Sequence, residues 1–272
     1  MRLALALLCA TAAAPPVLAQ QTDADALYDA LDLGTVIEVM REEGLDYGED
    51  LGQDLLGGQG GTAWTNLVDG LYDTGRMGDI VRARFTQELS DVDTAPLVEF
   101  FKGDLGQRVI RLENEARQAL TDEEIEDAAA ARVTQMRADD DPRIDLIGTF
   151  IEANDLVESN VVGAMNSNYA FYTGLLDGDV VDGGMTEEQA LSDVWAQEEA
   201  IREDTRDWVY SYLTLAYQPL SDEELNRYID ISRTDAGQAM NQALFDAFDE
   251  MYVDLSRRLG EGAARMMASE DI

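Results

Sequence analysis

The sequence contains no histidine, and its single cysteine, Cys9, lies in an N-terminal segment that we expect to be removed. These two residue types provide most ligands for zinc, copper and haem iron, so such sites are excluded from the rest of the chain. Catalysis that depends on histidine or cysteine is excluded with them, as are structural disulfides. We therefore predict no cofactor and assign no catalytic residue.

Basic residues are scarce. The chain has 19 lysines and arginines against 56 acidic residues, which gives a net charge of −37, and Lys102 is its only lysine. Such a charge repels phosphate-rich partners and anionic lipid surfaces, so we predict no nucleic-acid partner. An apolar content of 46% is nevertheless sufficient for a folded core, which distinguishes the chain from an acidic disordered tail.

The N-terminal apolar run is too short to cross a bilayer. It extends from Leu3 to Ala14, whereas a membrane-spanning helix needs about 20 apolar residues. Arg2 precedes the run, and small residues follow it as far as Ala19. This pattern is typical of a secretory signal peptide over residues 1–19, cleaved near Ala19. It predicts a periplasmic or secreted protein with no membrane span after cleavage.

Helix signals recur along the chain. Several Ser or Thr residues are followed three positions later by an acidic or amide residue, as in a capping box. The pairs are Thr121/Glu124, Thr186/Gln189, Ser221/Glu224 and, more weakly, Ser90/Asp93. Apolar residues follow at helical spacing, and no run alternates as a strand would. The sequence therefore predicts an all-α fold, with an irregularity near Asp204–Thr205 in the helix after Thr186.

The sequence also repeats itself. A shift of 131 positions places residues 64–120 on 195–251 with eleven identities, against roughly three or four expected by chance. We predict two homologous helical repeats, at 22–138 and 143–266, that form a bundle with pseudo-twofold symmetry. The acidic segment 139–142 is the expected linker, and residues 267–272 are expected to form a frayed tail.

A short motif occurs once in each repeat: a capped helix, a basic residue, and a second helix with glycine in its first turn. Its residues are Lys102, Gly106 and Gln107 in the first repeat, and Arg233, Thr234, Gly237 and Gln238 in the second. The motif resembles that of an exported bacterial family catalogued as domain of unknown function 2059, and the second copy is the closer match. The resemblance implies an α-helical periplasmic protein and no particular reaction. The residues themselves favour a structural role, in which Thr234 caps a helix and each glycine allows a close backbone approach.

Two groups of residues are candidates for ligand binding. Asn166, Asn168, Tyr169 and Tyr172 combine amides with aromatic rings, as sugar- and peptide-binding surfaces do, although packing would also explain them. Asp177, Asp179 and Asp182 offer oxygen ligands for calcium in a flexible loop, although their spacing is not that of an EF-hand and a solvated acidic turn would explain them as well. The three tryptophans, Trp64, Trp195 and Trp208, are predicted to anchor the core.

Three functions remain open on the sequence. The first is a non-catalytic interaction or structural module that contacts an unknown envelope protein or periplasmic component. The second is a calcium- or small-ligand-binding module. The third is a carboxylate-dependent hydrolase that acts on envelope polymers. The missing residue types favour the first two.

Overall fold

The computed structural model describes residues 16–58, 60–177 and 186–270, without the side chains of residues 16–22 and 269–270. Thirteen α-helices and no strand occur in this part of the chain, which confirms the predicted all-α class. The first seven helices are α1 (Pro16–Ala30), α2 (Leu33–Leu56), α3 (Gly61–Leu71), α4 (Thr74–Glu88), α5 (Ala95–Lys102), α6 (Asp104–Ala119) and α7 (Glu123–Ala138). The other six are α8 (Pro142–Ala153), α9 (Leu156–Asp177), α10 (Glu187–Ala196), α11 (Glu198–Tyr217), α12 (Asp222–Ser232) and α13 (Asp235–Glu270).

The two ends of the chain bear on the predicted signal peptide and tail. Residues 1–15 lie outside the described residues, and 16–19 form the first turn of α1, so signal cleavage stays a prediction. None of the helices described is both long and apolar enough to span a membrane. At the other end α13 continues to Glu270, so most of the predicted frayed tail is helical.

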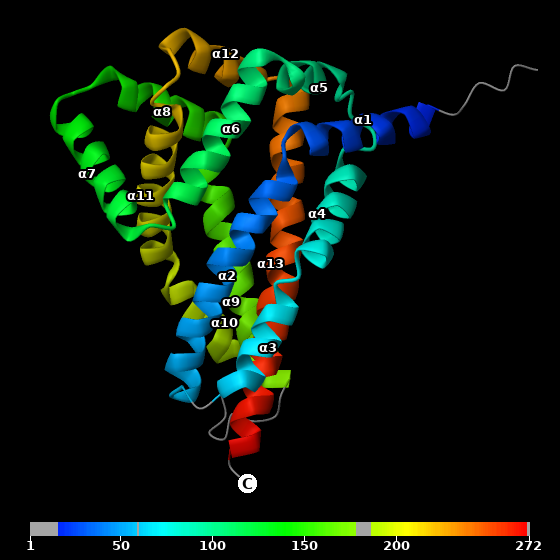
Figure 1. Ribbon diagram of the computed structural model, residues 1–272, viewed down its shortest axis with the longest axis vertical. Coiled ribbons are helices and arrows are strands. Elements are labelled where there is room, and N and C mark those ends of the chain that lie inside the picture. The colour runs from blue at the N-terminus through cyan, green and yellow to red at the C-terminus, as the bar shows by residue number, and fades with distance from the viewer. Residues whose placement is uncertain (1–15, 59, 178–185, 271–272) are drawn as a thin grey trace, which may run out of the picture.

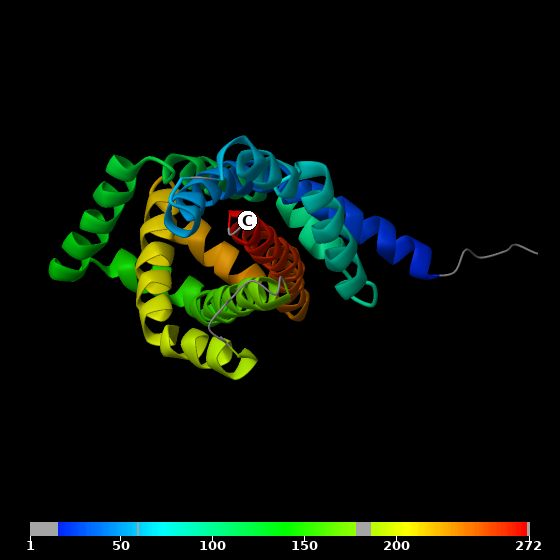
Figure 2. The same cartoon turned by 90° about the horizontal axis from the view of Figure 1, so that it is seen from below.

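The long helix α13 is the axis of the molecule. It runs through the centre of Figure 1, and the end-on view of Figure 2 shows it between the α2–α4 side and α9. Helices α5, α8 and α12 gather at one end, while α7 stands at the edge beside α11. Buried apolar residues from Ala24 to Ala263 form one continuous core, to which both predicted repeats contribute.

Helices of the two predicted repeats exchange partners. Across the repeats, α6 packs on α11 and α13 packs on α4; within each repeat, α1 packs on α5 and α8 packs on α12. Under the shift of 131 positions, α6 corresponds to α13 and α5 to α12. These reciprocal contacts are those that the predicted pseudo-twofold arrangement requires, although the symmetry itself stays a prediction.

The predicted capping boxes give a mixed result. Thr186/Gln189 and Ser221/Glu224 are confirmed, since both reciprocal hydrogen bonds are present at the starts of α10 and α12. The box at Thr121 is wrong because α7 begins one residue later, with Asp122 accepting from the Glu124 amide. The box at Ser90 is also wrong, since α5 begins only at Ala95. In both cases a polar residue nearby in the sequence, and not the predicted one, precedes the first residue of the helix.

The second repeat also departs from prediction around its first tryptophan. The helix breaks at Gln197, between α10 and α11, and continues without interruption through Asp204–Thr205. Trp195 is 58% exposed, so its predicted core role is wrong. Helix α10 buries its neighbour Val194, which turns Trp195 outward. Trp64 is buried as predicted, and its indole Nε1 donates to the Gly48 carbonyl at 2.7 Å.

Candidate functional site

A cleft of about 790 Å³ lies between α7 on one side and α8, α11 and the start of α12 on the other. Its volume lies within the range of pockets that hold small molecules, roughly 300–1,000 Å³. The apolar part of the lining is Ile125, Ala128, Ala129, Met136, Ile147, Leu215 and Leu220. The polar part is Glu124, Arg132, Asp141, Arg143, Thr214, Gln218, Ser221 and Asp222. The lining residues are thus about half apolar and half polar, and binding sites commonly combine apolar contact with polar groups that orient a ligand.

The composition of α7 explains why the cleft exists. This helix buries only Ala129, Val133 and Met136, and every residue from 123 to 128 is exposed. Residues 128–131 are all alanine, so two of the residues that line the cleft from α7, Ala128 and Ala129, have short side chains. These short side chains fill little of the space between α7 and its neighbours, and the exposed first two turns of α7 leave the cleft open next to Ile125.

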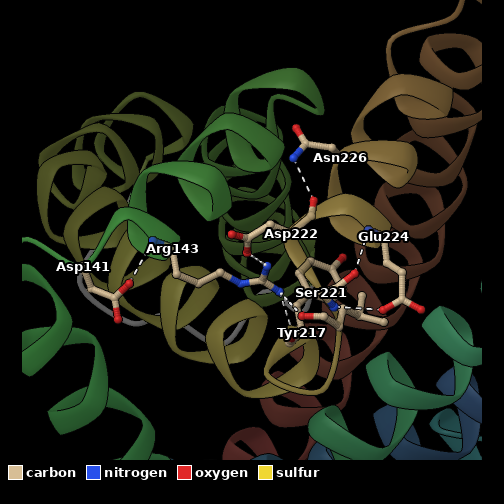
Figure 3. Close-up of polar contacts among 8 residues, drawn as sticks. Asp141, Arg143, Tyr217, Ser221, Asp222, Glu224 and Asn226 are labelled. Atoms are coloured by element: carbon tan, nitrogen blue, oxygen red, sulfur yellow. Dashed lines mark hydrogen bonds and ion pairs between the residues drawn. The ribbon is translucent and has the colours of Figure 1, made fainter.

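Arg143 fixes the opposite wall. From the first turn of α8 its guanidinium reaches the end of α11, as Figure 3 shows, and donates to the carbonyls of Tyr217 at 2.8 Å and Leu220 at 2.9 Å. It also forms an ion pair with Asp222 at the start of α12. The side chain of Arg143 is only 17% exposed. Hydrogen bonds from a charged donor are stronger than those between neutral groups, so Arg143 holds the end of α11 in place against α8.

Helix caps complete the same wall. Asp141 accepts from the backbone amide of Arg143 at 2.9 Å and so begins α8. Ser221 and Glu224 form the capping box of α12, with hydrogen bonds of 3.2 and 2.8 Å. From the far side Arg108 of α6 forms an ion pair with Glu224 at 2.7 Å. Two arginines, one from each predicted repeat, thus hold the turn between α11 and α12.

Two polar side chains of the cleft have no hydrogen-bond or ion-pair partner among the described residues. The Thr214 side-chain oxygen is buried and has no hydrogen-bond partner among the described residues, which is unusual for a helical threonine. Arg132 forms neither an ion pair nor a hydrogen bond with any described residue. Since an unpaired buried hydroxyl costs free energy, a partner at Thr214 would stabilise the protein.

A buried carboxyl lies behind this wall. The Tyr217 hydroxyl donates to Glu113 of α6 at 2.7 Å. Tyr217 therefore contacts Arg143 through its backbone carbonyl and Glu113 through its side-chain hydroxyl. Burial raises the pKa of Glu113 to about 7, while hydrogen bonds from Tyr217 and Tyr228 oppose the rise. Burial, and next the charge of Glu113, raises the pKa of Tyr217 and Tyr228 well above the usual value. The interface between α6, α11 and α12 therefore contains a group that titrates near neutral pH.

The structure separates the predicted ligand surface on α9. Asn166 donates to Asp249 of α13 at 3.1 Å, whereas the Tyr169 hydroxyl donates to Glu187 of α10 at 2.8 Å. Asn168 and Tyr172 are partly exposed. None of these four lines the cleft.

The predicted calcium ligands are only partly described. Asp177 forms an ion pair with Arg257 at 2.7 Å, so a cation would compete with this arginine. Asp179 and Asp182 lie outside the described residues. Within the described ranges no group of three acidic residues is arranged to hold a metal ion.

The motif residues take part in helix packing. A Cβ atom on Gly106 would overlap the Phe100 carbonyl of the preceding helix, and one on Gly237 would overlap that of Ile231. Thr234 accepts from the Gly237 amide at 3.0 Å and so caps α13. These two glycines occupy equivalent places in the two helix pairs.

The remaining motif residues differ between the copies. Gln238 donates at 2.7 Å to the carbonyls of Ala153 and Ser232, which joins α13 to α8 and α12. Gln107 lies instead in a second surface hollow, beside α2. Lys102 and Arg233 are exposed at the ends of α5 and α12, without an ion pair to any described residue.

Neither the cleft nor the role of Glu113 is predicted from the sequence. The alanine run at 128–131 is the one signal that points to the cleft, because a helix with small side chains cannot fill the space beside it. Glu113 is one of 56 acidic residues, and only the surrounding tyrosines, brought from α11 and α12, distinguish it.

Comparison with known families agrees with the resemblance at the motif. Residues 75–135 match the family model described as "Uncharacterized protein conserved in bacteria (DUF2059)". The match covers α5, α6 and nearly all of α4 and α7, including the α7 wall of the cleft as far as Arg132. The second copy of the motif resembles the family pattern more than the first copy does, yet it lies outside the matched range. No curated protein and no solved structure gives a significant match.

Proposed function

We propose that this protein is a non-catalytic binding module of the bacterial envelope that holds an apolar small molecule in the cleft between α7, α8 and α11. The observation that carries the proposal is the cleft itself, which has the volume of a ligand pocket and seven apolar residues in its lining. Thr214, a polar residue of the lining, supports it, because its side-chain oxygen has no hydrogen-bond partner among the described residues. The N-terminal pattern of a signal peptide supports a periplasmic location.

The architecture suits binding better than catalysis. The polar groups of the α8–α12 wall are used in helix caps and in the Arg143 contacts, so they hold the wall in place. The most strongly perturbed carboxyl, Glu113, lies behind the wall among tyrosines and is not part of the lining. A preformed wall opposite a loosely packed helix allows a ligand to enter without unfolding the core.

The test fills the cleft with a side chain. Ala128→Phe places a ring in the cleft from an exposed position, so we expect little loss of stability. Ala130→Phe adds the same ring to α7 at an exposed position that does not line the cleft. The neutral probe N-phenyl-1-naphthylamine, which fluoresces in apolar surroundings, reports occupancy. We expect saturable binding to the wild type and to Ala130→Phe, and at least tenfold weaker binding to Ala128→Phe; equal binding to both variants, or none to the wild type, would refute the proposal.

A further inference from the structure

We infer that the occupant of this cleft is a fatty acid: a single alkyl chain that lies along α7 and ends in a carboxylate bound by Arg132. The inference rests on the proposed binding function and specifies its ligand. It follows from the charge of Arg132, from the pairing or distance of the acidic residues around it, and from the apolar residues of the lining.

Arg132 is the one arginine of the cleft lining without an ion pair to a described residue. Acidic residues outnumber basic ones by about three to one, and most described arginines are ion-paired, including Arg108, Arg137 and Arg143 near the cleft. Arg132 lines the cleft and has no partner among the described residues. An unpaired guanidinium beside an apolar surface is a ready site for a carboxylate, which it can bind through two parallel hydrogen bonds.

The acidic residues of the cleft do not cancel this charge. Asp222 is neutralised by its ion pair with Arg143. Asp141 accepts from the amide of Arg143 and lies at the positive N-terminal end of α8. Glu124 is eight residues from Arg132 on α7, which is about 12 Å along the helix axis. A carboxylate at Arg132 therefore meets one uncompensated positive charge nearby.

The apolar part of the lining provides contact for an alkyl chain. Ala128 and Ala129 on α7 face Ile147 of α8 and Leu215 of α11, so the cleft is a space between helices with short side chains on one wall. An alkyl chain can follow such a space, and each buried CH₂ group contributes about 0.8 kcal/mol. The chain of a fatty acid supplies the apolar contact, and its head group supplies the partner that Arg132 lacks.

The experiment compares three head groups on one chain length. Dodecanoate, dodecanol and dodecylammonium are titrated at pH 8 against the wild-type protein, each displacing N-phenyl-1-naphthylamine. Arg132→Gln removes the proposed head-group contact. Arg206→Gln is the matched control, because Arg206 is also exposed and without an ion pair to a described residue, yet lies outside the cleft.

We expect dodecanoate to bind best, and Arg132→Gln to weaken its binding at least tenfold while leaving dodecanol and the neutral probe unchanged. Arg206→Gln should leave all three affinities unchanged. If the probe binds but dodecanoate binds no better than dodecanol, or Arg132→Gln has no effect, the inference of a fatty acid is wrong and the cleft remains a binding site. If neither the probe nor any alkyl compound binds, the proposed function itself fails.

Discussion

Replacement of Glu113 by glutamine should change how the stability of the protein depends on pH. The folded protein holds this carboxyl with a pKa of about 7, against an ordinary pKa of 4.5 for an unburied glutamate, and burial is the main cause. Below pH 4.5 the carboxyl is protonated in both states and has no effect on the pH dependence. As the pH rises toward 7, the unfolded chain loses this proton while the folded protein keeps it, so stability falls.

The size of the effect follows from the two pKa values. One pKa unit corresponds to 1.36 kcal/mol, so a rise from 4.5 to about 7 costs the folded state about 3 kcal/mol at neutral pH. The loss is complete just above pH 7 and does not grow further. Glutamine resembles the protonated carboxyl: its oxygen can accept from Tyr217, and it cannot ionise.

Urea unfolding of both proteins at intervals from pH 4 to pH 8.5 measures the effect. We expect the difference in unfolding free energy, variant minus wild type, to rise by about 3 kcal/mol across this range. Glu126→Gln serves as the control, because it removes the same charge from an exposed position on α7. A difference for Glu113→Gln that stays constant with pH, or that follows the control, would show that the carboxyl is not held protonated.

Three further predictions concern stability. Gly237→Ala should destabilise the protein by about 2 kcal/mol in urea unfolding, because its Cβ atom would overlap the preceding helix, whereas Gly70→Ala, in open space on α3, should stabilise it by up to about 1 kcal/mol; equal effects would contradict the packing argument. Arg143→Gln should lower the free energy of unfolding by about 2–3 kcal/mol, since it leaves two carbonyls and a carboxylate without their donor, and an unchanged urea midpoint would show that the Arg143 contacts contribute nothing. Removal of residues 1–19 should leave the Tm unchanged, because the described core begins at Ala24, and a fall of more than about 5 °C would show that this segment belongs to the fold.

Local signals predicted the helices well and their packing less well. The capping boxes at Thr186 and Ser221 depend on residues three positions apart, so the sequence alone specifies them. Trp195 shows the opposite case: its neighbours are apolar, but α10 ends at Ala196, packs on α9 and buries Ala190 and Val194 instead of Trp195. Sequence spacing could not reveal which face of α10 is buried.

The cleft and Glu113 were beyond prediction for a related reason. Each depends on which helices meet, and those helices are far apart in the chain. Tyr217 lies more than a hundred residues from Glu113, and α7 and α12 come from different predicted repeats. The alanines of α7 leave a space only because the neighbouring helices do not fill it.

The exchange of partners between the predicted repeats determines when the protein can fold. Helix α4 is packed by α13, the last helix of the chain, and Arg76 of α4 is ion-paired with Asp254 of α13. A chain that emerges from a ribosome or a translocation channel therefore exposes the apolar face of α4 until its C-terminal end has followed. Contacts between such distant segments slow folding, because the chain must close a long loop before they form. A newly made molecule needs protection from aggregation during that interval, and a truncated one never completes its core.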